Sequence, residues 1–328
     1  MKNSSLIKIL DCTLRDGGYL NDWNFSKSSI KSIITNLNDS KIDFIECGFL
    51  KERKNKENNT IFSSIKDLNF LPLPFQNYTL MINIGEYDVK NFTTCLNKNI
   101  KIRVAFKKYQ QKEALEYIQV LKNLDWDVFA NPMSTNTYSE KELFDLITEL
   151  NLINPFGLTI VDTLGNMFED DVIKIINFID SKLNPNIALG FHSHNSLQLS
   201  FANTKAILKM NIKRLFIIDA CLYGMGRGAG NLCTELITKY LNDTYHSNYN
   251  IQPLLKSIED DLMPIYKKTP WGYSMPYYIG AINNCHPNYV KFLLQKGKTD
   301  KEIDLILSSF SEDKKLCFDE NYAESLLK

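Results

Sequence analysis

Short runs of apolar, often β-branched residues recur along this 328-residue chain, and polar or glycine-containing segments separate them. Runs of about four to eight such residues, bounded by turn-forming residues, are typical of buried β-strands. Eight runs fit this description: residues 7–12, 44–49, 79–84, 100–106, 126–130, 157–162, 187–191 and 215–220. The pattern therefore predicts eight strands.

Segments with helical spacing of apolar residues lie between the predicted strands. Residues 26–37 begin with Ser26 as the expected N-cap, and residues 140–150 place four apolar side chains on one face behind Ser139. Eight strands alternating with eight helical segments predict a parallel sheet, and about 240 residues suit a closed (β/α)8 barrel. An open doubly wound sheet is the alternative. It would normally carry a G-x-G-x-x-G sequence after the first strand, which this chain lacks.

The alternating pattern ends near residue 243. Beyond it lie an aromatic run at residues 271–278 and helical patterns at about residues 290–295 and 302–309. We therefore predict a TIM-barrel domain of residues 1–243 and a small helical C-terminal extension of residues 244–328 that packs on the barrel.

Composition excludes some classes of partner. Lysine plus arginine equals aspartate plus glutamate, 38 against 38, so no basic surplus is present to hold a nucleic acid. No apolar stretch approaches the roughly 18 residues of a membrane span, and the first ten residues lack the apolar core of a signal peptide. The seven cysteines are scattered and form no CxxC pair, which indicates reduced thiols. We expect a cytoplasmic protein without membrane or nucleic-acid partners.

Two histidines, His192 and His194, end the seventh predicted strand. Side chains at positions i and i+2 of a strand share one face, so both imidazoles can reach one metal ion. Asp16, in the segment Arg15-Asp16-Gly17 after the first strand, can supply a carboxylate. Taken singly, such motifs more often form hydrogen bonds or turns. Both lie at carboxyl ends of predicted strands, where barrel enzymes gather their chemistry, and this favours a divalent metal site.

A glycine-rich loop follows the eighth predicted strand and precedes a predicted helix at residues 232–241. Its glycines, Gly226, Gly228 and Gly230, would let the backbone approach a carboxylate or phosphate closely, and the helix N-terminus would add positive potential. A tight strand-to-helix turn is the other interpretation.

The residues resemble the metal-dependent lyases and synthases of the DRE-TIM group. Five motifs in order, across about residues 7–236, carry the resemblance: Asp11-Cys12-Thr13-Leu14-Arg15-Asp16-Gly17, Ile45-Glu46-Cys47-Gly48, Asp162-Thr163-Leu164-Gly165, His192-Ser193-His194-Asn195, and Gly224-Met225-Gly226 through Gly230-Asn231. Within the group, the segment from Gly190 to Asn203 is most similar to 4-hydroxy-2-oxoacid aldolases. Acyl-CoA lyases of the group usually carry a cysteine in the glycine loop, and residues 223–231 contain none.

The resemblance implies a site and its cofactor. Asp16, His192 and His194 would ligate one Mn²⁺ or Mg²⁺ ion, with Asn231 as a further oxygen ligand. Three other acidic residues would support the metal ligands: Asp11, Glu46 and Asp162. Asp11 and Glu46 would do so by holding Arg15. Such a site leaves positions open for the carboxylate and keto oxygen of a 2-oxoacid such as pyruvate.

The implied reaction joins the enolate of pyruvate to an aldehyde or reverses that step, with Arg15 stabilising the enolate oxygen. Known aldolases of the group use a histidine three positions after the metal aspartate as the base, and this chain has Tyr19 there. Tyrosine is a poor base at neutral pH. Either the pKa of Tyr19 is lowered, or the base is a water molecule or a tyrosine of residues 271–278, of which we select Tyr273. His286 and His246 are expected on the surface or in packing.

Two other functions stay open: a Claisen-type synthase that condenses an acyl-CoA with a 2-oxoacid, and a metal-binding subunit without turnover that serves a partner enzyme. The resemblance also implies a homo-oligomer and a dehydrogenase partner. The aldehyde is not identified by the sequence. The charged run at residues 51–57 is either a solvated loop or a site that attracts a phosphorylated or nucleotide-linked aldehyde.

Overall fold

The computed structural model describes residues 4–52, 59–72 and 77–327. Most of the charged run at residues 51–57 lies outside these residues. All strands of the described chain are parallel. They are β1 (Ile7–Asp11), β2 (Phe44–Leu50), β3 (Ile61–Phe62), β4 (Tyr78–Asn83), β5 (Ile100–Phe106), β6 (Val128–Pro132), β7 (Gly157–Asp162), β8 (Ala188–Ser193) and β9 (Phe216–Ala220).

Strand pairing closes the sheet into a barrel. The strand order runs from β1 through β9, β8, β7, β6, β5 and β4 to β2, and β1 also pairs with β2. The strands at the two ends of this series, β1 and β2, therefore pair with each other, which an open sheet does not allow. Short β3 pairs only with β2, outside the closed ring. The prediction of a (β/α)8 barrel is confirmed, and the open doubly wound alternative is excluded.

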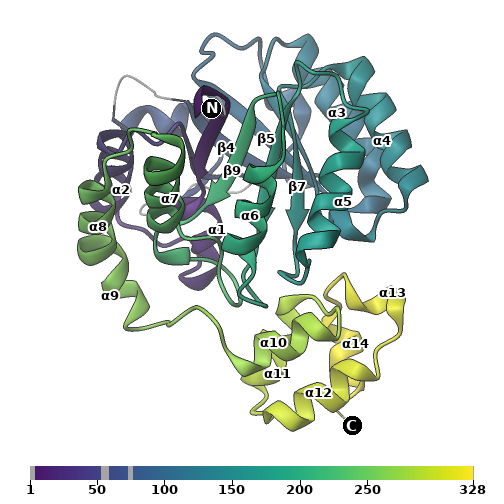
Figure 1. Cartoon of the computed structure of the whole chain (residues 1–328). Coiled ribbons are helices and arrows are strands. Elements are labelled where there is room, and N and C mark those ends of the chain that lie inside the picture. Colours follow the sequence, from purple (N-terminus) through teal and green to yellow (C-terminus); the bar gives the residue numbers. More distant parts are fainter. Residues whose placement is uncertain (1–3, 53–58, 73–76, 328) are drawn as a thin grey trace.

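Helices surround the barrel and continue beyond it (Figure 1). They are α1 (Thr13–Asp16), α2 (Lys27–Asp39), α3 (Gln111–Asn123), α4 (Glu140–Ile153), α5 (Glu169–Asp180), α6 (Ser200–Lys209), α7 (Thr234–Tyr245), α8 (Ile251–Ser257), α9 (Met263–Tyr266), α10 (Met275–Ile282), α11 (Pro287–Gln295), α12 (Asp300–Ser308), α13 (Glu312–Lys315) and α14 (Glu320–Ser325). Ser26 and Ser139 cap α2 and α4 as predicted, each accepting a backbone N–H three residues on.

Two of the eight expected helical connections differ from the prediction. In the described residues, the connection after β2 carries β3 and a 3₁₀ segment at Ile65–Phe70, and the connection after β4 carries one at Val89–Asn91. Pro72 and Pro74 in the first connection disfavour a long helix, since proline lacks the N–H that a helix interior needs. The second connection spans only residues 84–99.

The C-terminal helices form a lobe below the barrel (Figure 1). After α7, α8 packs against α2 and α7. The chain then continues through α9 to the helices α10 to α14. These last helices have a hydrophobic cluster of their own, which includes Tyr289, Leu293 and Leu307. The lobe touches loops at the carboxyl ends of the strands, since Asn166 Nδ2 donates to the carbonyl of Ala281 at 3.2 Å. It therefore lies on the face where the candidate site is built.

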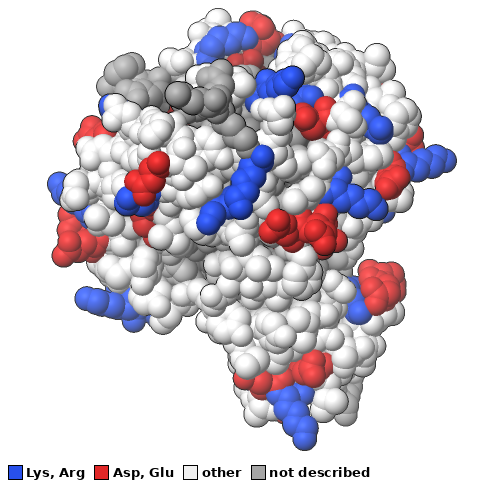
Figure 2. Space-filling view, in the orientation of Figure 1, with Lys and Arg blue, Asp and Glu red and all other residues white. Residues whose placement is uncertain are grey.

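Charged side chains of both signs are interspersed over the face seen in Figure 2, in keeping with the equal numbers of acidic and basic residues. Within residues 4–52, 59–72 and 77–327, no helix is both long and apolar enough to span a bilayer. The boundary between residues 243 and 244 stays a prediction.

Candidate metal centre

Three buried side chains that can hold a metal ion meet at the carboxyl ends of the strands. Asp16 ends α1, which follows β1 almost directly, and His192 and His194 come from the end of β8. One carboxylate oxygen and two imidazole nitrogens lie within 4.8 Å of one another. None of the three residues is more than 6% exposed. The structure thus brings together side chains that the sequence places on distant segments.

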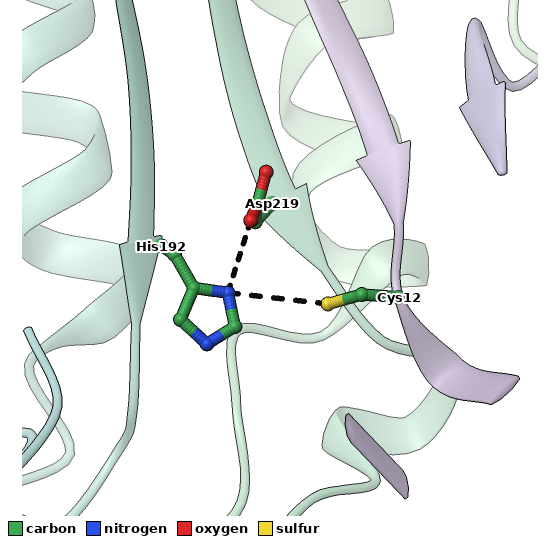
Figure 3. A group of neighbouring side chains, drawn as sticks. All are labelled: Cys12, His192 and Asp219. Atoms are coloured by element: carbon green, nitrogen blue, oxygen red, sulfur yellow. Dashed lines mark hydrogen bonds and ion pairs between the residues drawn. The ribbon is translucent and has the colours of Figure 1, made fainter. Parts of the chain in front are cut away.

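Hydrogen bonds orient both imidazoles. His192 Nδ1 donates to Asp219 Oδ2 at 3.1 Å, and His194 Nδ1 donates to the carbonyl oxygen of Gly230 at 3.3 Å. Figure 3 shows the first contact, with the other ring nitrogen of His192 on the far side of the ring from Asp219. A hydrogen-bond acceptor at one ring nitrogen fixes the tautomer of the histidine and leaves the other nitrogen free for a metal ion. Both histidines therefore present Nε2 to the site.

Asn231 can supply the fourth donor, an amide oxygen, that the resemblance implies. Its Nδ2 donates to Asp16 Oδ2 at 2.6 Å and to the carbonyl of Met225 at 3.1 Å. Its Oδ1 is buried and has no hydrogen-bond partner among the described residues. A buried amide oxygen without a partner is costly, and a cation would satisfy it. The donor set of two imidazoles, a carboxylate and an amide oxygen therefore fits a divalent ion.

Gly226 allows Asn231 and Asp16 to approach each other. A Cβ at Gly226 would lie 2.0 Å from Asn231 Nδ2 and 2.9 Å from Asp16 Oδ2.

We expect Gly226→Ala to cost about 1–3 kcal/mol of stability and to weaken Mn²⁺ binding by about tenfold or more. Denaturant unfolding and Mn²⁺ titration measure the two effects. Gly297→Ala, where an added Cβ meets nothing within 4 Å, should leave Mn²⁺ binding unchanged. Wild-type Mn²⁺ affinity in Gly226→Ala would contradict the role of this close approach.

A continuous series of buried charges connects the two sides of the site. Arg15 Nη1 contacts Asp16 Oδ1 at 2.5 Å, and Arg15 Nε contacts Glu46 Oε2 at 2.6 Å. The other Glu46 oxygen pairs with Arg103 Nη1 at 3.2 Å, and Arg103 Nη2 pairs with Asp219. Asp219 in turn accepts from His192. The charges along this series alternate in sign. Glu46, which holds Arg15, and Asp219, which orients His192, therefore each have Arg103 as a cationic partner.

Burial and neighbouring charges set the protonation of the donors. Burial opposes ionisation of Asp16, but the charges of Arg15 and His192 and the hydrogen bond from Asn231 outweigh it and hold its pKa well below the usual range. Burial, reinforced by nearby cations, lowers the pKa of His194 to about 3, so its ring is neutral. Burial lowers the pKa of His192, but its hydrogen bonds with Asp219 and Cys12 exceed this effect and raise the pKa to about 10. A metal ion at His192 must therefore displace a proton.

A second group of metal-type ligands shares His192: Cys12, His192 and Asp219 (Figure 3). Its atoms are already engaged. The Cys12 thiol donates to the carbonyl of Ala220 at 3.4 Å and lies 4.0 Å from His192 Nδ1, and Asp219 Oδ2 pairs with Arg103 as well as His192. A cation here would lie next to the Arg103 guanidinium. We interpret this group as the support of His192.

The expected roles of Asp11 and Asp162 change in the structure. Only Glu46 of the predicted pair holds Arg15, because Asp11 accepts from the backbone N–H of Thr13 at 3.0 Å and from the Thr234 hydroxyl at 2.6 Å. Asp11 thereby ties the end of β1 to the start of α7. Asp162 accepts backbone N–H groups of the loop after β7. Both shape loops around the site.

Stability should depend on pH through Asp11. Burial raises the pKa of Asp11 from 3.8 to about 6, although its hydrogen bonds to Thr234 and Thr13 oppose the shift. A raised pKa means that the stabilising contribution is complete below pH 3.8 and is lost as the pH rises through 6. Relative to Asp11→Asn, the unfolding free energy of the metal-free wild type should fall by about 3 kcal/mol between pH 4 and 7. Urea unfolding of both proteins measures this, and a pH-independent difference would contradict it.

A cavity of about 60 Å³ opens onto the metal donors, room for a few water-sized groups. Its lining includes Arg15, Asp16, Tyr19, His192, His194 and Arg227. A larger groove of about 850 Å³ between α4, α5 and α10 contains none of these donors. The chemistry therefore belongs to the smaller cavity.

The two tyrosines selected from the sequence lie in different places. Tyr19 lines the cavity, packed against Trp23 with ring centroids 4.7 Å apart. Tyr273 is half exposed, packs beside Tyr278 and does not line the cavity. Tyr277 lies closer to the loop after β9, because a Cβ at Gly228 would be 3.3 Å from its ring. The structure brings Tyr19 to the site and leaves Tyr273 outside it.

Sequence reasoning missed Arg103, Asp219 and Arg227. Arg103 and Asp219 are single charged residues inside apolar strands, in Ile-Lys-Ile-Arg-Val-Ala-Phe and Phe-Ile-Ile-Asp-Ala. A charge in such a position is rarely buried without a partner, and that signal could have identified both. Arg227 was visible only as part of the glycine-rich loop.

Comparisons with known proteins agree with this geometry. A family model described as HMGL-like matches residues 6–260. The 4-hydroxy-2-oxovalerate aldolase of Pseudoalteromonas translucida is 26% identical over 272 residues, which cover 79% of this chain and 76% of the relative. The enzyme of that name from Leptothrix cholodnii is 28% identical over 240 residues, or 70% and 68% of the two chains.

Solved structures show the same architecture. The N-terminal domain of a Bacteroides vulgatus protein described as an aldolase superposes with a TM-score of 0.74 at 28% identity, over 88% of this chain and 96% of that domain. The hydroxymethylglutaryl-CoA lyase of Pseudomonas aeruginosa has a TM-score of 0.66 at 16% identity, over 88% and 97% of the chains, and shares the fold. Because the family model covers well over half of its residues, the chain belongs to the HMGL-like family.

Proposed function

We propose that this chain is a divalent-metal-dependent aldolase, a carbon–carbon lyase that joins pyruvate to an aldehyde or cleaves the product. One observation carries the proposal: Asp16, His192 and His194 converge, with the unpartnered Asn231 Oδ1 nearby and the fixed charge of Arg15 beside them. The names of the relatives, 4-hydroxy-2-oxovalerate aldolases, support the same reaction class.

The donor set suits Mn²⁺ or Mg²⁺, since carboxylate and amide oxygens are hard ligands and imidazole is accepted by Mn²⁺. Such an ion, when bound, would act as a Lewis acid toward the oxygens of a 2-oxoacid. The cavity beside the donors is lined by Arg15, Asp16 and both histidines, so an oxoacid bound there would face Arg15 and the metal donors together. Mn²⁺ and Mg²⁺ are distinguished by titration of metal-free protein with each ion.

Arg15 stabilises the negative charge of the enolate. Its guanidinium is held by Glu46 on one side and by Asp16 on the other, and it lines the cavity. Loss of a proton from the methyl group of pyruvate places negative charge on the C2 oxygen. A preorganised cation at that position stabilises the charge without having to reorient during the reaction.

Tyr19 acts in this proposal as a proton donor. Burial raises the pKa of Tyr19 above its ordinary value, so the hydroxyl keeps its proton at neutral pH. In the condensation direction, C3 of the enolate forms a bond to the aldehyde carbon, and the aldehyde oxygen takes the proton of Tyr19. A raised pKa suits that donation better than proton abstraction. By microscopic reversibility, the Tyr19 oxygen takes the same proton back from the C4 hydroxyl in the cleavage direction.

Exchange of the pyruvate methyl protons tests the proposal. Wild-type protein loaded with Mn²⁺ should incorporate deuterium from D₂O into the methyl group of pyruvate, and EDTA-treated protein should not. NMR or mass spectrometry of the recovered pyruvate measures the exchange. Absence of exchange in the protein with bound Mn²⁺ would overturn the enolate step and favour a metal-binding subunit without turnover.

Release of CoA separates the aldolase from a Claisen-type synthase. The aldolase should form its product from pyruvate and an aldehyde without any acyl-CoA. The family resemblance also predicts a homo-oligomer and a dehydrogenase partner. Measurement of the molecular mass of the protein in solution tests the prediction of a homo-oligomer.

A further inference from the structure

Arg227 is a cavity-lining arginine without an anionic partner among the described residues. Four arginines are described, and three of them pair with carboxylates: Arg15 with Asp16 and Glu46, Arg103 with Glu46 and Asp219, and Arg214 with Asp180. Arg227 forms no ion pair in the described chain, and its Nε is buried without a hydrogen-bond partner. A partly buried guanidinium whose buried Nε has no partner is suited to bind an anion supplied by a ligand.

The loop and the C-terminal helices hold Arg227 at the cavity. Its guanidinium carbon lies 4.8 Å from the centroid of the Tyr19 ring. The next residue, Gly228, has φ of +67°, and a Cβ there would lie 3.3 Å from Tyr277 and 3.7 Å from Pro287. A larger residue would be strained at this φ and would press on α10 and α11. The lobe therefore packs closely against the loop that presents the guanidinium.

Groups around Arg227 are hydrogen-bond donors. The Nδ1 of His286, the residue before α11, accepts the backbone N–H of Asn288 at 3.2 Å, so a neutral ring carries its proton on Nε2. Burial lowers the pKa of His286, and the charges of Arg227 and Lys107 add to this effect. The potential at this side of the cavity is therefore positive.

Arg15 already contacts Glu46 and Asp16 and faces the enolate in the proposed reaction, so it is not the arginine that would hold an anionic group on the aldehyde. Arg227 shares the cavity with Asp16 and both histidines, so one small substrate can reach the metal donors and Arg227 together. On the basis of the proposed function, we infer that Arg227 binds an anionic group, a carboxylate or a phosphate, on the acceptor aldehyde, and that the enzyme prefers anionic to neutral aldehydes.

Paired aldehydes that differ in charge test the inference. Condensation with pyruvate is compared for 4-oxobutanoate against butanal, and for glyceraldehyde 3-phosphate against glyceraldehyde, with the Mn²⁺-loaded protein. In at least one pair, kcat/KM should be about tenfold or more higher for the anionic member. The pair that shows the preference identifies the anion as carboxylate or phosphate. Equal or lower kcat/KM for both anionic members would overturn the inference.

Arg227→Gln should remove the preference, so that kcat/KM becomes similar for the anionic and the neutral member of each pair. Pyruvate methyl exchange by the same variant checks that it is folded and binds Mn²⁺. Lys108→Gln removes one positive charge from a lysine that pairs with Glu142 after β5, and it should retain the preference. A raised KM for pyruvate in the exchange assay of Arg227→Gln would overturn the inference, because Arg227 would then bind pyruvate itself.

Failure of the proposed function is distinguishable from failure of this inference. If the wild type shows no exchange, the aldolase proposal fails, and binding of inorganic phosphate and succinate then decides the role of Arg227. Calorimetric titration should show binding of one of these anions that is weakened about tenfold or more in Arg227→Gln and unchanged in Lys108→Gln. Equal binding by the wild type and Arg227→Gln, or no binding by either, would overturn the inference.

Discussion

Replacing Asp16 by asparagine should abolish Mn²⁺ binding at the barrel mouth and lower pyruvate methyl exchange by at least about 10³-fold, or about 4 kcal/mol. Asp16 is the only carboxylate among the converging donors, and its burial next to Arg15 keeps it ionised. Asparagine has nearly the same shape but no charge, so the loss would reflect the missing anion. Mn²⁺ titration and the exchange assay measure the two effects.

Asp180→Asn is the matched control for Asp16→Asn. Asp180 pairs with Arg214, which contacts the carbonyl of Ile187 just before β8 and so lies at the opposite end of the barrel. This control should bind Mn²⁺ and exchange pyruvate protons like the wild type. Retention of either property in Asp16→Asn would show that Asp16 is not a ligand.

Arg103→Met should destabilise the fold by about 3–5 kcal/mol and weaken Mn²⁺ binding by about 10–100-fold. Arg103 is 1% exposed and is the cation between Glu46 and Asp219. Its removal leaves two buried carboxylates without their shared partner, while methionine preserves much of the side-chain volume. Denaturant unfolding of the metal-free protein measures the first effect, and Mn²⁺ titration measures the second.

A double variant separates charge from packing at Arg103. Arg103→Met combined with Asp219→Asn removes one of the two carboxylates that lose Arg103, so it should be more stable than Arg103→Met alone. Its Mn²⁺ affinity should stay low, because asparagine is a weaker acceptor for the ring N–H of His192. If the double variant were no more stable than the single variant, loss of packing would explain the effect of Arg103.

Local sequence patterns were sufficient to predict the barrel. The strands are fully buried, and their apolar runs stand out from the polar connections; β5, for example, spans the predicted residues 100–106. Two-residue β3 could not be predicted, because Ile61 and Phe62 are extended only through their pairing with Phe49 and Leu50 of β2. The short 3₁₀ connections were missed for a similar reason, since tertiary contacts determine them.

Motifs at strand ends predicted the metal donors. The residues that hold these donors and Arg15 in place could be identified only from the folded structure. Asp16 and His192 are recognisable because each lies where an apolar strand stops, and carboxyl ends of parallel strands meet at one face. The partner of Arg15 depends on which way a carboxylate points, and Asp11 turns toward Thr234 while Glu46 faces Arg15. No local pattern distinguishes these two directions.

Aromatic residues before and within α10 illustrate the same limit. The sequence analysis selects Tyr273, but α10 begins only at Met275. Tyr277 is therefore part of the helix that packs on the glycine-rich loop, while Tyr273 lies in the connection before it and is half exposed. The start of a short helix decides which tyrosine approaches the barrel.

The position of a bound manganese ion tests the account most directly. A crystal of the protein grown with Mn²⁺ should show one anomalous scattering peak that contacts a carboxylate oxygen of Asp16 and the Nε2 atoms of His192 and His194. The peak should also lie within bonding distance of Asn231 Oδ1. A peak between Cys12, His192 Nδ1 and Asp219, or no peak at the barrel mouth, would contradict the assignment of the metal centre and the reaction built on it.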